Sequence, residues 1–129
     1  MTHYWYNEYD SVEVSELVGK TLVDVNTGDE HIRFKTDDGI DFVMHHEQDC
    51  CESVYVEDIN GDLSDLIGQP IVMAEEVTES GVEDDYGESF TWTFYKIGTV
   101  KGVVTIRWYG TSNGYYSEAV DFIRLKEDE

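Results

Sequence analysis

A mainly β domain of the α+β class is predicted for this chain: an antiparallel sheet, or a small barrel or sandwich, of about seven or eight strands with two short helices. Most apolar segments alternate apolar and polar residues with a period of two. Two strong turn sequences, D-G and N-G, lie between such segments, and two other apolar segments with helical spacing end in glycine. With 129 residues, 40% of them hydrophobic and 13% aromatic, residues 1–129 are expected to form one domain with its own core.

The first hairpin is predicted between residues 30 and 46. In Glu30–Thr36 the apolar side chains fall on alternate positions and therefore on one face. Ile40–His46 alternates in the same way, and parity places His46 on its apolar face. The D-G pair at Asp38 and Gly39 supplies the turn that joins the two strands.

Three further strands are expected at Cys51–Asp58, Ile71–Thr78 and Phe90–Ile97, the last with Trp92 and Phe94 on one face. A final hairpin is expected between Val103–Tyr109 and Tyr115–Leu125, because Asn113 and Gly114 form an N-G turn sequence between them. On its first strand the core-facing residues should be Val104, Ile106 and Trp108, and those on the opposite face Thr105, Arg107 and Tyr109.

The two short helices are expected at the beginning of two similar segments, Val14–Val23 and Leu63–Val72. Both place apolar residues three and four positions apart before a glycine, Gly19 or Gly68, which suits the left-handed residue that ends a helix. Pro70 then prevents the second helix from continuing.

Negative charge is the strongest feature of the composition. The chain has 29 acidic and 8 basic residues, a formal net charge of −21. Residues 1–88 contain 24 acidic and three basic residues, whereas residues 89–129 contain five of each. Such a field repels nucleic acids and anionic membranes and attracts basic surfaces, so we expect a basic protein surface as partner, with no direct nucleic-acid or membrane contact. Solvation of a small protein is the alternative reason for this charge.

The window Met44–Asp58 is rich in chemically reactive residue types. It holds both cysteines of the chain and two of its four histidines, so a metal site, if one exists, would use His46, Cys50 and Cys51. Adjacent cysteines point to opposite faces of an extended chain, and neighbouring acidic residues disfavour a reactive thiolate. A structural corner is therefore the preferred interpretation, with free cysteines in a reducing cytoplasm and no metal or cofactor.

A second group of candidate residues lies near the N-G turn, in a stretch without acidic residues from Ser89 to Ser117. Tyrosine and arginine are common in binding hot spots, and arginine can hold a phosphate or carboxylate. Cross-strand packing of the aromatic rings is the alternative interpretation. The candidate ligand- or partner-binding residues are Arg107, Tyr109, Asn113, Tyr115 and Tyr116, together with the acidic residues Glu83, Asp84 and Asp85 of a turn-rich segment.

The segments Q-D-C-C-E and I-R-W-Y-G-T-S-N-G-Y-Y-S-E carry a resemblance to a known family. Over roughly residues 16–123 the chain resembles a family of small uncharacterised proteins carried mainly by bacteriophages and prophages. The resemblance implies a phage or prophage origin and expression in the bacterial cytoplasm. It implies no catalytic residues. It also implies that a site in this window, if one exists, would depend on His46 rather than on His45.

We therefore expect an acidic binding protein that inhibits a bacterial host factor, such as a defence or nucleic-acid-binding protein, in the manner of a DNA mimic. A protein that binds a small ligand such as a nucleotide signal near Arg107 is the alternative, and a metal-binding protein is the second alternative. No enzyme is expected, because the common nucleotide-binding and hydrolase motifs are missing from the sequence.

Overall fold

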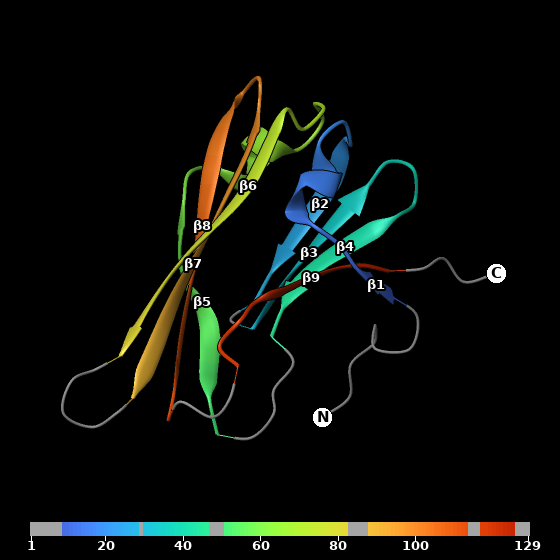
Figure 1. Cartoon of the computed structure of the whole chain (residues 1–129). Coiled ribbons are helices and arrows are strands. Elements are labelled where there is room, and N and C mark those ends of the chain that lie inside the picture. The colour runs from blue at the N-terminus through green and yellow to red at the C-terminus, as the bar shows by residue number, and fades with distance from the viewer. Residues whose placement is uncertain (1–8, 29, 47–50, 83–87, 114–116, 126–129) are drawn as a thin grey trace.

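The computed structural model of the protein describes residues 9–28, 30–46, 51–82, 88–113 and 117–125, which form nine strands and two 3₁₀ turns. The strands are β1 (Tyr9–Ser11), β2 (Leu22–Thr27), β3 (His31–Thr36), β4 (Asp41–His45), β5 (Ser53–Asn60), β6 (Met73–Val82), β7 (Ser89–Thr99), β8 (Gly102–Ser112) and β9 (Asp121–Leu125). They build two antiparallel sheets with the orders β1-β9-β4-β3-β2 and β5-β8-β7-β6. Figure 1 shows these sheets as two separate layers, so the mainly β prediction is confirmed and the open two-sheet form is the one adopted.

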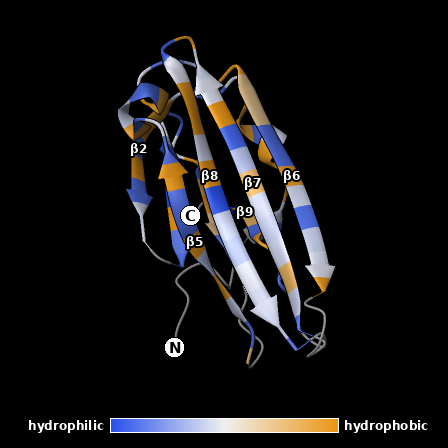
Figure 2. Cartoon of the chain, turned by 90° about the vertical axis from the view of Figure 1, so that its left-hand side faces the viewer, coloured by the Kyte–Doolittle hydropathy of each residue, from blue (hydrophilic) through white to orange (hydrophobic). Residues whose placement is uncertain are grey.

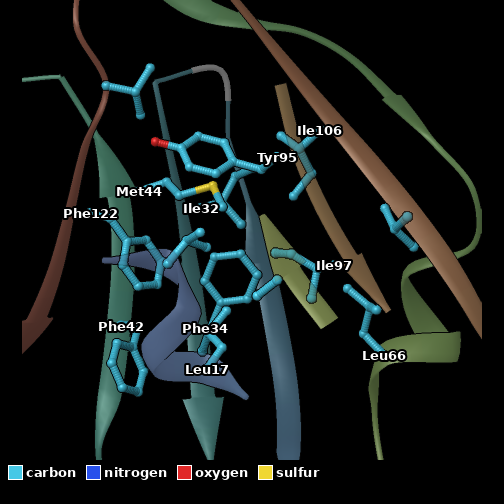
Figure 3. Packing of buried hydrophobic residues seen from close by; sticks show 14 of the residues in the cluster. Leu17, Ile32, Phe34, Phe42, Met44, Leu66, Tyr95, Ile97, Ile106 and Phe122 are labelled. Carbon is cyan, nitrogen blue, oxygen red and sulfur yellow. The ribbon is translucent and has the colours of Figure 1, made fainter. Parts of the chain in front are cut away.

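The core fills the space between the two sheets, because alternate residues of most strands point into it. The five-stranded sheet contributes three phenylalanines, of which Phe42 and Phe122 stack with ring centroids 5.5 Å apart. Tyr95 and Ile97 of β7 pack against them from the other sheet, as Figure 3 shows. The expected inward positions on β8 are confirmed: the buried residues are Val104, Ile106 and Trp108.

The hairpin predicted between residues 30 and 46 is present as β3 and β4, with Phe34 opposite Phe42. Gly39 has a φ of 88°, a left-handed conformation that a glycine adopts without strain. The last predicted hairpin is wrong. β8 lies between β5 and β7, whereas β9 pairs with β1 and β4 in the other sheet. Since both edges of β8 are already paired, the chain after Ser112 has to cross to the opposite layer.

The two expected helices are also wrong in kind, because each is a single 3₁₀ turn: η1 (Val14–Leu17) and η2 (Leu63–Leu66). Beyond these turns the two similar segments hydrogen-bond to one another, with Gly68 N–H donating to the Leu22 carbonyl at 3.0 Å. This pairing takes up backbone groups that a longer helix would have used internally, so neither helix extends past one turn. No helix in the described part of the chain is long and apolar enough to cross a bilayer.

Candidate functional site

The outer face of the four-stranded sheet carries a row of aromatic side chains. Tyr109 of β8 and Trp92 of β7 are register partners, and their ring centroids lie 4.4 Å apart. On the other side of Tyr109, Tyr55 of β5 meets it edge-on at 6.2 Å, while Phe94 stacks on Trp92 at 6.4 Å. The inward positions of these strands fill the core, so the aromatic side chains lie on the opposite, outer face. Figure 2 shows the four-stranded sheet, with β5, β8, β7 and β6 side by side, from this outer face.

Arg107 lies on the outer face, the side predicted for it, beside the aromatic row, and its charge is already matched. Its guanidinium carbon sits 5.3 Å from the centroid of the Trp92 ring, within the range of a cation–π contact. Its Nε donates to a Glu57 carboxylate oxygen at 2.7 Å, and Asp58 lies 3.7 Å from Nη2. An anionic ligand would therefore have to displace two carboxylates from this arginine.

Acidic residues border the aromatic face on both edge strands. Glu57 and Asp58 belong to β5, and Glu75 and Glu79 lie on the outer side of β6. The strands between them, β7 and β8, contain no acidic residue, which accounts for the acid-free stretch of the sequence. The result is an aromatic centre that includes Arg107, with carboxylates on both edge strands.

The structure places only part of the predicted binding residues. Arg107 and Tyr109 are together on the aromatic face, and Asn113 directly follows β8. Tyr115, Tyr116, Glu83, Asp84, Asp85 and Cys50 lie outside the described residues. Tyr55 and Trp92 were not among the predicted site residues, although the parity of β7 already places Trp92 on its outward face.

His46 directly follows β4, Glu52 directly precedes β5, and their side chains form a buried pair. The His46 Nδ1–H donates to the Ala119 carbonyl at 2.7 Å, and its Nε2 lies 2.6 Å from a Glu52 carboxylate oxygen. The two side chains are only 5% and 0% exposed. Both ring nitrogens are thus occupied by oxygen partners, which leaves neither of them directed at a metal.

Glu118 is a second buried carboxylate, and it directly precedes Ala119, whose carbonyl accepts the hydrogen bond from His46. Its Oε1 accepts a hydrogen bond from Thr91 at 2.8 Å, and its Oε2 accepts one from Ser112 at 2.5 Å and another from Ser89. A Cβ at Gly110 would lie 3.0 Å from the Glu118 Cβ, so a glycine there gives this chain segment room to lie against β8. Residues 117–120, the crossing segment that precedes β9, therefore contact both His46 and the ends of β7 and β8.

These contacts favour the structural interpretation of the histidine–cysteine window. No group of three or more histidine, cysteine, aspartate or glutamate side chains is placed to hold a metal among the described residues. Cys51 is disulfide-bonded rather than free, which contradicts the expectation of free thiols and removes its thiolate as a metal ligand. His46 acts instead as a link between Glu52 and the crossing segment.

Comparison with known proteins identifies the family but not a function. Residues 15–122 match the model of a domain of unknown function, DUF7448, and this range covers most of the chain. The chain therefore belongs to the DUF7448 family, and the expected membership of an uncharacterised family is confirmed. No curated protein and no solved structure matches the chain.

Proposed function

We propose that this member of the DUF7448 family is an acidic binding protein of phage or prophage origin. It acts in the bacterial cytoplasm, docks on a basic surface of a host protein through the aromatic face, and inhibits that protein. A defence protein or a nucleic-acid-binding protein fits this description, since its basic surface would otherwise contact phosphates.

The observation that carries this proposal is the aromatic face with its acidic border. Protein interfaces commonly combine an apolar centre rich in tyrosine, tryptophan and arginine with a polar rim. Tyr55 is 38% exposed although its ring contacts Tyr109, so the aromatic row is partly open to a partner. Burial of these rings would supply affinity, because about 25 cal/mol is gained per Å² of apolar surface removed from water.

The negative charge of the protein would increase the rate of association with a basic partner and the selectivity of binding. Charges of opposite sign on two proteins accelerate their encounter and weaken wrong pairings, and both effects decline with salt. A net charge of −21 makes this contribution large for a protein of 129 residues. Binding is therefore expected to weaken strongly as the salt concentration rises.

The alternative function, binding of a nucleotide signal near Arg107, has less support. Glu57 and Asp58 already neutralise this arginine, and an anion would have to approach through a negative field. A small phosphate ligand would thus gain little binding free energy from Arg107, because the existing ion pairs of this arginine would first have to be broken.

The proposal can be tested by affinity capture from a bacterial lysate at low salt. We expect the wild-type protein to retain a small set of basic proteins that salt elutes. Trp92→Ala should lose them, because this ring contacts both Tyr109 and Arg107. Val23→Ala is the matched control, since Val23 is 53% exposed on the other sheet and its loss should change nothing.

Captured proteins that are neutral or acidic, or that Trp92→Ala retains as well as wild type, would contradict the proposal. Circular dichroism of each variant separates a lost interface from a lost fold.

A further inference from the structure

The two sheets present four edge strands, and three of them carry features that discourage pairing with another chain. β1 has only three residues. The registers of β2 and β5 shift at a bulge, between Leu22 and Asp24 and between Val56 and Asp58. β6 differs, because its ten residues pair with β7 in one unbroken register and pair with no other described strand.

The free edge of β6 is open along most of its length. All residues from Glu75 to Ser80 are exposed, and Val77 and Val82 are 51% and 64% exposed. An edge strand of this kind presents a row of unpaired N–H and C=O groups to any extended chain that approaches. η1 lies near β6, and the outer side of the strand adjoins the aromatic face, where Val77 and Glu79 are register partners of Phe94 and Trp92.

The side chains of β6 select what can pair with this edge. Its ten residues include three glutamates and no lysine or arginine. Glu75, Val77 and Glu79 point outward, whereas Glu76 points inward opposite Tyr95. The Glu76 residue is exposed as a whole, but its carboxyl group is partly shielded from water and lies near Glu13, and both effects raise its pKa.

A second copy of the chain is a poor occupant for this edge. Two β6 strands side by side would bring glutamates on both strands close together, and like charges on neighbouring strands repel. A strand with lysine or arginine opposite the glutamates would reverse the sign of each of these contacts. Charge complementarity therefore favours a basic extended segment over self-association.

We propose that β6 binds an extended basic segment of a partner protein as a fifth strand of the four-stranded sheet. Because side chains alternate, the recognised pattern is Lys-X-Val-X-Lys, with the lysines opposite Glu75 and Glu79 and the valine opposite Val77. The pattern reads the same in both directions and therefore fits a parallel or an antiparallel strand. This inference rests on the proposed function, since it names the part of a basic partner that the protein recognises.

Synthetic peptides and purified protein provide the test. A peptide with the Lys-X-Val-X-Lys pattern should bind at low salt, and amide hydrogen exchange should slow along β6. The same peptide N-methylated at alternate residues keeps its charge but cannot form the strand hydrogen bonds, so it should bind at least about tenfold more weakly.

Two double variants of the protein distinguish an effect of charge on β6 from an effect of the total net charge. Glu75→Lys/Glu79→Lys should weaken peptide binding by about tenfold or more, because two attractive contacts become repulsive. Asp24→Lys/Glu30→Lys changes the net charge equally at exposed positions, one on β2 of the other sheet and one just before β3, and should reduce binding far less. Circular dichroism confirms that both variants are folded.

Equal binding of the N-methylated peptide, equal weakening by the two double variants, or unchanged exchange along β6 would overturn the inference. The proposed function would then still be supported by a Trp92-dependent capture of a basic protein, because the lysate experiment is independent of the peptide experiment. Loss of both results would remove the proposed function as well.

Discussion

Replacement of Glu118 by alanine should destabilise the protein, because this carboxylate ties the crossing segment to the ends of β7 and β8. Thr91 donates to its Oε1 at 2.8 Å and Ser112 donates to its Oε2 at 2.5 Å, and the Ser89 hydroxyl donates as well. Glu118 itself is 8% exposed. The substitution would therefore leave three partly buried hydroxyls without their acceptor.

The size of the effect follows from these three contacts. A hydrogen bond to a charged group contributes about 1.5 to 3 kcal/mol, but part of this is recovered after the substitution. The Ser89 and Ser112 oxygens are 3.1 Å apart and can hydrogen-bond to one another. We therefore expect Glu118→Ala to lower the free energy of unfolding by about 2 to 4 kcal/mol. Glu118→Gln, which keeps the shape and one carbonyl acceptor, should lower it by about 1 kcal/mol.

Urea unfolding followed by circular dichroism measures these differences, and thermal unfolding should show a decrease in Tm of roughly 4 °C per kcal/mol. Glu88→Ala is the control, since Glu88 is an exposed glutamate next to Ser89 and its loss changes the net charge equally. If Glu118→Ala and Glu88→Ala differ by less than about 0.5 kcal/mol, Glu118 does not hold the crossing segment.

Three further changes have expected outcomes. Tyr95→Phe should raise the free energy of unfolding by about 1 kcal/mol, because the buried Tyr95 hydroxyl has no hydrogen-bond partner among the described residues. Burial raises the pKa of Tyr95, so wild-type stability should fall above about pH 10, where the unfolded tyrosine ionises, and Tyr95→Phe should lessen this fall. Gly61→Ala should cost about 1 to 3 kcal/mol in urea unfolding, because Gly61 has a φ of 119° and a Cβ would lie 2.9 Å from the Val103 carbonyl. The Thr36 hydroxyl bond lowers the pKa of Asp38 to about 2, so this carboxylate stabilises the fold above about pH 4 and should lose that contribution towards pH 2. Asp38→Asn should make acid unfolding less steep over that range, and an unchanged slope would contradict it.

The orientation of side chains was well predicted for β8. Alternation placed Ile106 and Trp108 in the core and Arg107 and Tyr109 outside, and the structure confirms all four. This succeeds because the side-chain period of a strand is a local property of the extended backbone. The turn at Gly39 was predicted for a similar reason, since its left-handed backbone suits glycine.

The candidate site was predicted only in part, because its residues come from distant parts of the chain. Tyr55 and Trp92 join Tyr109 only because β5 and β7 both pair with β8. The ion pair between Glu57 and Arg107 spans 50 positions, and no local pattern indicates it. Without that pair, Arg107 looked available to an anion, whereas in the structure its charge is matched.

Local chemistry thus sufficed for the mainly β composition, the direction of side chains, one hairpin and the distribution of charge along the chain. The neighbours of each strand required the complete fold. Backbone hydrogen bonds between strands are nearly independent of sequence, so the N-G sequence alone could not hold β9 beside β8. Burial of residues such as Phe122 against Phe42 places β9 in the other sheet, and this choice depends on the whole core at once.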